Sequence, residues 1–133
     1  MLTDTRTLTY TTDEGQIATS QDSQIGDGRA AYDGSIAAST ETQVLLPFPK
    51  DAIKSLLIYS EQASIIVNSN NADPGGDDTI NVGAAQCFIW NANDPASNAN
   101  PFAAADVVSL YIKNESSTEA TNVKIRVLLD ITP

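Results

Sequence analysis

One stretch decides the fold: Asn122-Val123-Lys124-Ile125-Arg126-Val127-Leu128-Leu129-Asp130-Ile131. Apolar residues stand at every second position, and successive side chains of a strand point to opposite faces. One face therefore carries Val123, Ile125, Val127 and Leu129, while the other carries Lys124, Arg126, Leu128 and Asp130. This alternation with a period of two is typical of a half-buried β-strand, so the chain is expected to contain a sheet with one face in a core.

Similar short runs precede this strand and are separated by turn-forming clusters. We predict strands at residues 55–60, 63–69, 79–82, 86–91 and 107–113. Only Glu61-Gln62 separates the first two runs, so they form either a hairpin or one bent strand. Residues 70–78, 92–100 and 114–120 are rich in Asn, Asp, Gly, Pro or Ser and are predicted to be loops. Residues 51–54 are expected to form one helical turn after Pro49.

The first 43 residues differ from the rest because they are polar and rich in Thr, Ser, Asp and Gln. Only Thr7–Thr11 alternates clearly enough to predict a strand there, and the segment is expected to add edge strands or to extend as an arm. The whole chain of 133 residues fits a single domain. The predicted fold is all-β: an antiparallel β-sandwich over residues 1–133, jelly-roll or immunoglobulin-like, with an extended N-terminal segment.

Charge limits the classes of partner. The net charge is −10, from 17 acidic and 7 basic residues, and the pI is near 4.1. Such a surface repels phosphate backbones and anionic lipid headgroups, so we expect neither nucleic-acid nor membrane binding. The N-terminal residues lack the basic and apolar regions of a signal peptide, and no apolar run has the length of about 20 residues that spans a bilayer. We therefore expect synthesis in a cytoplasm-like compartment.

Residues for common catalytic chemistry are scarce. Histidine is absent, which removes Ser-His-Asp and Cys-His arrangements and nearly all zinc sites. The single cysteine, Cys87, lies in the apolar run Cys87-Phe88-Ile89-Trp90 and is expected to be buried and inert. With 17 acidic residues, a pair of nearby carboxylates arises by chance and does not indicate glycoside hydrolysis. We expect no enzymatic activity and no cofactor.

The loop Asp73-Pro74-Gly75-Gly76-Asp77-Asp78 is the one candidate for a calcium site. Calcium is bound by six to eight oxygen atoms, roughly, and clustered Asp residues in a glycine-rich turn supply several. The spacing matches no EF-hand. The favoured interpretation is a solvated turn whose side chains bond the backbone.

Aromatic residues provide candidates for packing or for an interface. Trp90 and Tyr111 would suit a carbohydrate-stacking platform, which gives a carbohydrate-binding module as an alternative function. Because Trp90 adjoins Phe88 in a dense apolar run, a role in the core or in an interface is favoured. Phe102 follows Pro101 and either locks a loop or presents an apolar contact to a neighbour.

The C-terminal two-thirds, about residues 54–133, resembles a group of small proteins encoded among the virion structural genes of tailed phages. The matching segments, in order, are Lys54–Ser60, Asp77–Asn81, Phe88–Trp90, Asn100–Phe102, Asp106–Asn114 and Val123–Asp130. The resemblance implies an accessory virion component, made in the host cytoplasm and located on the capsid surface as a decoration or cement protein.

The same resemblance implies partners but no catalytic residues. The expected partners are the major capsid protein and copies of the chain itself, with a homotrimer as one arrangement. Leu128, an apolar residue on the otherwise polar face of the last strand, is the candidate for the contact between copies. A position in the tail or neck is the alternative within this class.

Overall fold

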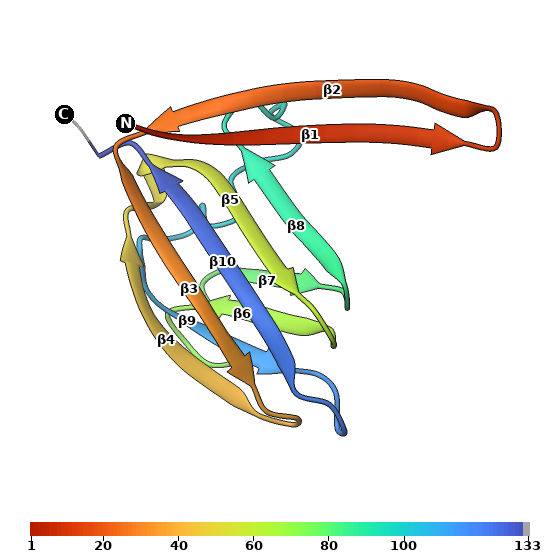
Figure 1. Cartoon of the computed structure of the whole chain (residues 1–133). Coiled ribbons are helices and arrows are strands. Elements are labelled where there is room, and N and C mark those ends of the chain that lie inside the picture. The colour runs from red at the N-terminus through yellow and green to blue at the C-terminus, as the bar shows by residue number, and fades with distance from the viewer. Residues whose placement is uncertain (132–133) are drawn as a thin grey trace.

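The computed structural model describes residues 1–131 of the chain, and in this part the elements are strands apart from one 3-10 turn (Figure 1). In chain order they are β1 (Leu2–Thr12), β2 (Gly15–Gly26), β3 (Gly28–Ile36), β4 (Glu41–Phe48), η1 (Lys50–Ala52), β5 (Ile53–Ser60), β6 (Ile65–Ser69), β7 (Thr79–Val82), β8 (Gln86–Asn91), β9 (Val107–Asn114) and β10 (Thr121–Leu129). The strands predicted at 79–82 and 86–91 are confirmed residue for residue. The helical turn predicted at 51–54 is the shorter η1, and residues 53 and 54 belong to β5 instead.

Two four-stranded sheets form the sandwich, in the orders β3-β10-β5-β8 and β4-β9-β6-β7. The pairing is nested and antiparallel: β3 with β10, β4 with β9, β5 with β8, and β6 with β7. A long hairpin of four strand pairs, rolled so that successive pairs alternate between two sheets, is the jelly-roll topology. The structure therefore confirms the all-β sandwich and favours the jelly-roll over the immunoglobulin-like alternative.

The core lies between the two sheets and contains the predicted face of β10. Val123, Ile125 and Val127 are at most 1% exposed, and Leu129 joins them at the end of the strand. The facing sheet contributes buried aliphatic side chains from β6 and β9. Interdigitated aliphatic side chains of this kind supply most of the stability of a sandwich.

The relation between residues 55–60 and 63–69 differs from both predicted alternatives. The two runs, β5 and β6, are consecutive strands in opposite sheets. The chain crosses between the layers at Glu61–Ser64, where the buried hydroxyl of Thr121 accepts hydrogen bonds from the backbone N–H groups of Gln62 and Ala63. The buried Ser60 and Thr121 hydroxyls lie 2.7 Å apart. Side-chain hydroxyls thus hold a connection whose own residues have poor turn chemistry.

The polar N-terminal segment divides into two parts. β3 is an edge strand of the first sheet and β4 is an edge strand of the second. β1 and β2 instead form a separate two-stranded sheet, a hairpin that crosses the end of the sandwich and continues beyond it past β8 (Figure 1).

Candidate functional site

The hairpin β1–β2 is the most distinctive feature of the molecule. Its register runs from the pair Leu2 and Gly26 to the pair Thr12 and Gly15, with a bulge after Tyr10. Asp13 and Glu14 form the turn, and Gly15 adopts φ = +104°, a conformation that suits glycine. Isolated two-stranded hairpins are marginally stable in water, so the contacts that fix this one to the sandwich determine where it points.

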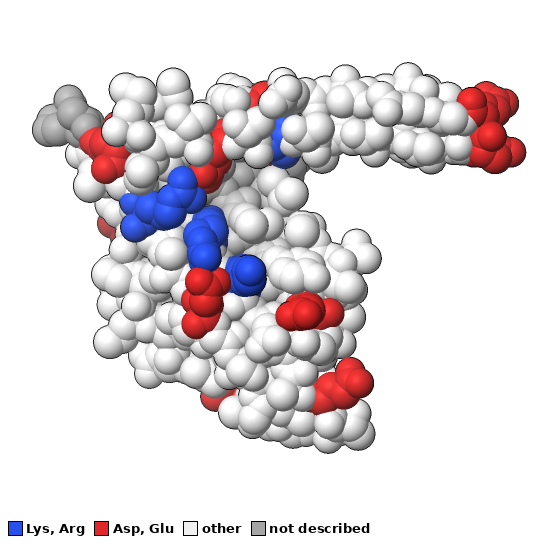
Figure 2. All heavy atoms as spheres, viewed as in Figure 1, with Lys and Arg blue, Asp and Glu red and all other residues white. Residues whose placement is uncertain are grey.

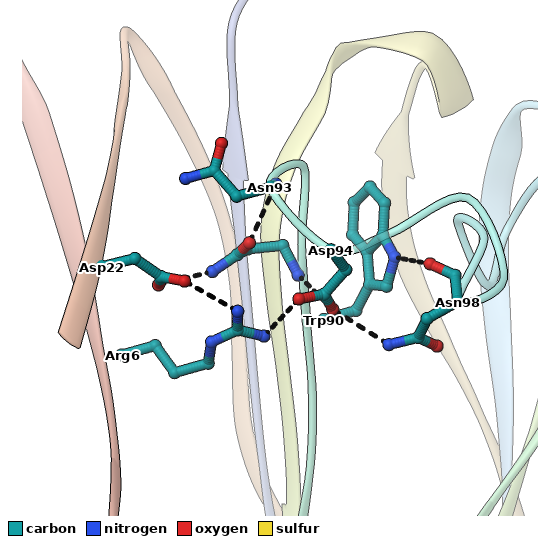
Figure 3. Close-up of polar contacts among 7 residues, drawn as sticks. Arg6, Asp22, Trp90, Asn93, Asp94 and Asn98 are labelled. Carbon is teal, nitrogen blue, oxygen red and sulfur yellow. Dashed lines mark hydrogen bonds and ion pairs between the residues drawn. The ribbon is translucent and has the colours of Figure 1, made fainter. Parts of the chain in front are cut away.

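The root of the hairpin is the part next to the sandwich, residues 2–6 and 21–26. Arg6 lies at its centre (Figure 3). Its guanidinium group binds Asp22 on β2 and Asp94 in the loop after β8, both at 2.7 Å. Asn91, the last residue of β8, donates a hydrogen bond to the other oxygen of Asp22 at 2.8 Å. The hydrogen bond from Arg6 holds the pKa of Asp22 below its ordinary value. Arg6 therefore fixes both strands of the hairpin to the loop beside β8.

Asp4 makes a second polar contact at the root. It accepts hydrogen bonds from Arg29 on β3 and from the hydroxyl of Ser55 on β5. Burial acts to raise the pKa of the Asp4 carboxyl, but these hydrogen bonds and the charge of Arg29 outweigh burial and lower it. The ionised form of Asp4 is thus the form that holds the hairpin against the sheet.

The root also makes an apolar contact, between Gly26 and Leu128. This contact shows that the prediction of Leu128 as an exposed interface residue is wrong. Leu128 does point to the outer face of its sheet, but it is 0% exposed because Gly26 of the hairpin covers it. A Cβ atom at Gly26 would lie 2.9 Å from Cγ of Leu128 and 2.4 Å from the backbone oxygen of Leu129. Leu128 is therefore a packing residue within the chain and is not exposed for a contact between copies.

A cleft lies in the angle between β1 and the outer face of the sheet β3-β10-β5-β8. Its volume is about 430 Å³, and its lining combines polar residues of β1 with Leu57, Ile89, Arg29 and Arg126. Lys124 follows on the same face of β10, two residues before Arg126. Figure 2 shows these basic side chains gathered beneath the hairpin, next to the hollow. We call Arg29, Lys124 and Arg126 the basic shelf.

The part of the hairpin beyond its root, residues 7–20, is called the free hairpin below. Its apolar side chains are exposed: Leu8 by 51%, Tyr10 by 66% and Ile17 by 57%. Leu8 and Tyr10 lie on the same face of β1 as Asp4 and Arg6, since they alternate with threonines. The side chains of Asp13 and Glu14 give the tip a negative charge, visible at the far end of the hairpin in Figure 2. The free hairpin thus combines exposed apolar side chains with an acidic tip.

The residues singled out from the sequence do not converge on one site. Trp90 is 8% exposed, and its indole N–H donates a hydrogen bond to the backbone oxygen of Asn98 at 2.8 Å (Figure 3). Phe102 is fully buried, edge-on to Phe48. Tyr111 is half-buried on the other sheet. The ring of Trp90 is thus part of the core and offers no open stacking platform for a sugar.

Cys87 is exposed, so the prediction that it is buried is wrong. It lies on the outer face of β8, an edge strand, whereas Trp90 and the partly buried Phe88 lie on the inner face of the same strand. An apolar run in the sequence does not show which residues of an edge strand remain in solvent.

The acidic loop is held by contacts within the chain. Each of its three carboxylates accepts a hydrogen bond. The side chain of Asn68 donates to Asp73, the side chain of Asn70 donates to Asp77, and the backbone N–H of Ala104 donates to Asp78. Within residues 1–131, no three or more carboxylate or thiol side chains are grouped so that they could hold a metal ion.

Comparison with protein-family models, curated proteins and solved structures finds no match to this chain. The comparisons therefore add nothing to the phage resemblance, which rests on the sequence segments given above. No helix in residues 1–131 is long and apolar enough to cross a membrane.

The sequence reasoning missed the residues that build this site. Arg6, Asp4 and Asp22 lie in a polar segment where only Thr7–Thr11 was predicted to be a strand. The available signal was the alternation of threonine with larger side chains from Thr3 to Thr11, which continues the strand pattern toward the N-terminus.

Proposed function

We propose that this chain is a structural protein of a tailed-phage particle, a decoration or cement protein that binds neighbouring major capsid proteins and stabilises the shell. The observation that carries the proposal is the hairpin β1–β2, which reaches past the sandwich with exposed apolar side chains (Figure 1). A rigid body with a projecting arm can contact more than one neighbour in an array, as a protein that stabilises a shell must do.

Other features support the same function. The nested jelly-roll gives a rigid body, and the charge of −10 favours solubility before assembly. Jelly-rolls occur in viral capsid proteins and in lectins, so the fold by itself does not choose between these classes. The burial of Trp90 weighs against a carbohydrate-binding module, and the resemblance of residues 54–133 favours the virion.

The composition of purified particles tests the proposal. Mass spectrometry of particles from the encoding phage should find the chain in a fixed ratio to the major capsid protein. Purified chain added to expanded shells that lack it should bind to saturation and raise the temperature at which the shells disrupt. Absence of the chain from the particles would refute a virion role. Electron microscopy that places it on the tail or neck would refute the capsid position.

A further inference from the structure

We propose that the free hairpin of one molecule docks in the cleft of a second copy of this chain, with its acidic tip on the basic shelf. The contact is head to tail, because the hairpin and the cleft are different surfaces of the same molecule. The inference deepens the proposed function, on which it rests, by naming the partner of the free hairpin. It is tested with the purified chain alone, without capsid shells.

Charge complementarity favours a second copy as the occupant. The free hairpin, residues 7–20, contains two acidic residues, Asp13 and Glu14, and no basic one, although the chain has seven basic residues in all. Three of those seven form the basic shelf. Asp4 and Asp33 form ion pairs with Arg29 and Arg126, and among the described residues Lys124 forms no ion pair, although Asp33 stands opposite it in the β3–β10 register. The three basic and two acidic side chains leave the shelf with one net positive charge. The shelf is thus a locally positive surface on a protein whose net charge is −10, and it attracts an acidic tip.

Apolar surfaces match as well. The free hairpin exposes Leu8, Tyr10 and Ile17, and the cleft presents Leu57 together with Ile89, which is 40% exposed. The free part of β1 is about six residues long, roughly 20 Å at 3.4 Å per residue. That reach lets the tip contact the shelf while Leu8 and Tyr10 lie over Leu57 and Ile89. Contacts of this kind remove exposed apolar side chains from water.

The hairpin cannot make this contact within its own molecule. Its root is fixed by Arg6 and Asp4 so that it forms the roof of its own cleft, and the free part points away past β8 (Figure 1). The tip is therefore available only to another molecule. A head-to-tail contact produces a closed ring if the rotation between copies closes, and an open chain if it does not.

Reversing the charges on the two surfaces tests the contact. We expect wild-type protein to associate reversibly in sedimentation velocity experiments over a concentration series. The tip variant D13K/E14K and the shelf variant K124E should each associate about tenfold more weakly. K50E, which makes the same charge change on η1 away from the shelf, is the matched control and should associate like the wild type. Asp13, Glu14 and Lys124 are exposed and Lys50 is half-buried beside Asp51, so each variant is expected to fold, and circular dichroism checks that it does.

A mixture of the two variants gives the sharper result. The lysine-bearing tip of D13K/E14K meets the glutamate-bearing shelf of K124E, so the mixture should associate more strongly than either variant alone. Replacing residues 9–19 by Asn-Gly keeps the root and removes most of the free hairpin, and this variant should be monomeric. A monomeric wild type at every concentration, or a mixture no stronger than its components, would overturn the proposal.

The result of this association test and the result of the particle-composition test are independent of each other. A chain that is monomeric in solution but present in particles at a fixed ratio would refute the contact between copies and leave the virion role standing. A chain that associates through its hairpin but is absent from particles would refute the virion role alone.

Discussion

Leu128→Ala tests whether the hairpin root covers the outer face of β10. The leucine side chain is 0% exposed, and truncation removes three carbon atoms that are worth about 0.8 kcal/mol each, or about 2.4 kcal/mol, from the buried surface. The cavity that remains beneath Gly26 adds to this, within the range of about 2–5 kcal/mol for such substitutions. We expect the free energy of unfolding to fall by about 3 kcal/mol and Tm to fall by roughly 10 °C.

Urea and thermal denaturation measure the change, and two leucines provide matched controls. Leu56, 1% exposed in the core, should lose a similar amount on Leu56→Ala, whereas Leu45, 75% exposed, should change by less than about 0.5 kcal/mol on Leu45→Ala. If Leu128→Ala behaves like Leu45→Ala, the hairpin does not pack on the sheet, and the reasoning about the root and the cleft is refuted.

Three other predictions concern the same face of the molecule. Gly26→Ala should destabilise the protein by about 1–3 kcal/mol in thermal denaturation, because the added Cβ would clash with the backbone oxygen of Leu129. Gly28→Ala is the control and should not destabilise it, because the nearest atom to its added Cβ is 3.5 Å away. Equal destabilisation by the two substitutions would contradict the packing of Gly26 on β10. The lowered pKa of Asp4 stabilises the root above the unfolded pKa of about 3.9, and this contribution is lost as pH falls through the folded pKa. The protection factors of the hairpin amides, which remove the intrinsic pH dependence of hydrogen exchange, should therefore fall below about pH 4 in the wild type and depend less on pH in Asp4→Asn; an equal dependence in the two proteins would exclude Asp4 as the cause. Cys87 should react with a thiol reagent in the native protein at close to the rate in the unfolded chain, and strong protection would contradict its exposure.

Local pattern was enough to predict most of the sandwich. Alternation in residues 122–131 and 107–113 and the short runs at 79–82 and 86–91 determine strands whichever neighbours they pair with. Asn, Gly and Pro clusters place the loops for equally local reasons. The candidate site was not predictable in this way, because Arg6 contacts Asp94 and Asp4 contacts Ser55, in each case a residue far away in the sequence.

The sequence by itself determined the all-β class, the strand positions in the C-terminal two-thirds and the inward face of β10, since each depends on side chains that alternate along one strand. Only the tertiary structure decided that β5 and β6 lie in opposite sheets, that Cys87 is exposed and that Leu128 is buried. The placement of β5 and β6 depends on the strands that they pair with, which the two runs themselves do not reveal. For Cys87 and Leu128 the physical reason is the same. Burial on the outer face of a sheet depends on whether a distant segment covers it, and the pattern within a strand holds no information about that segment.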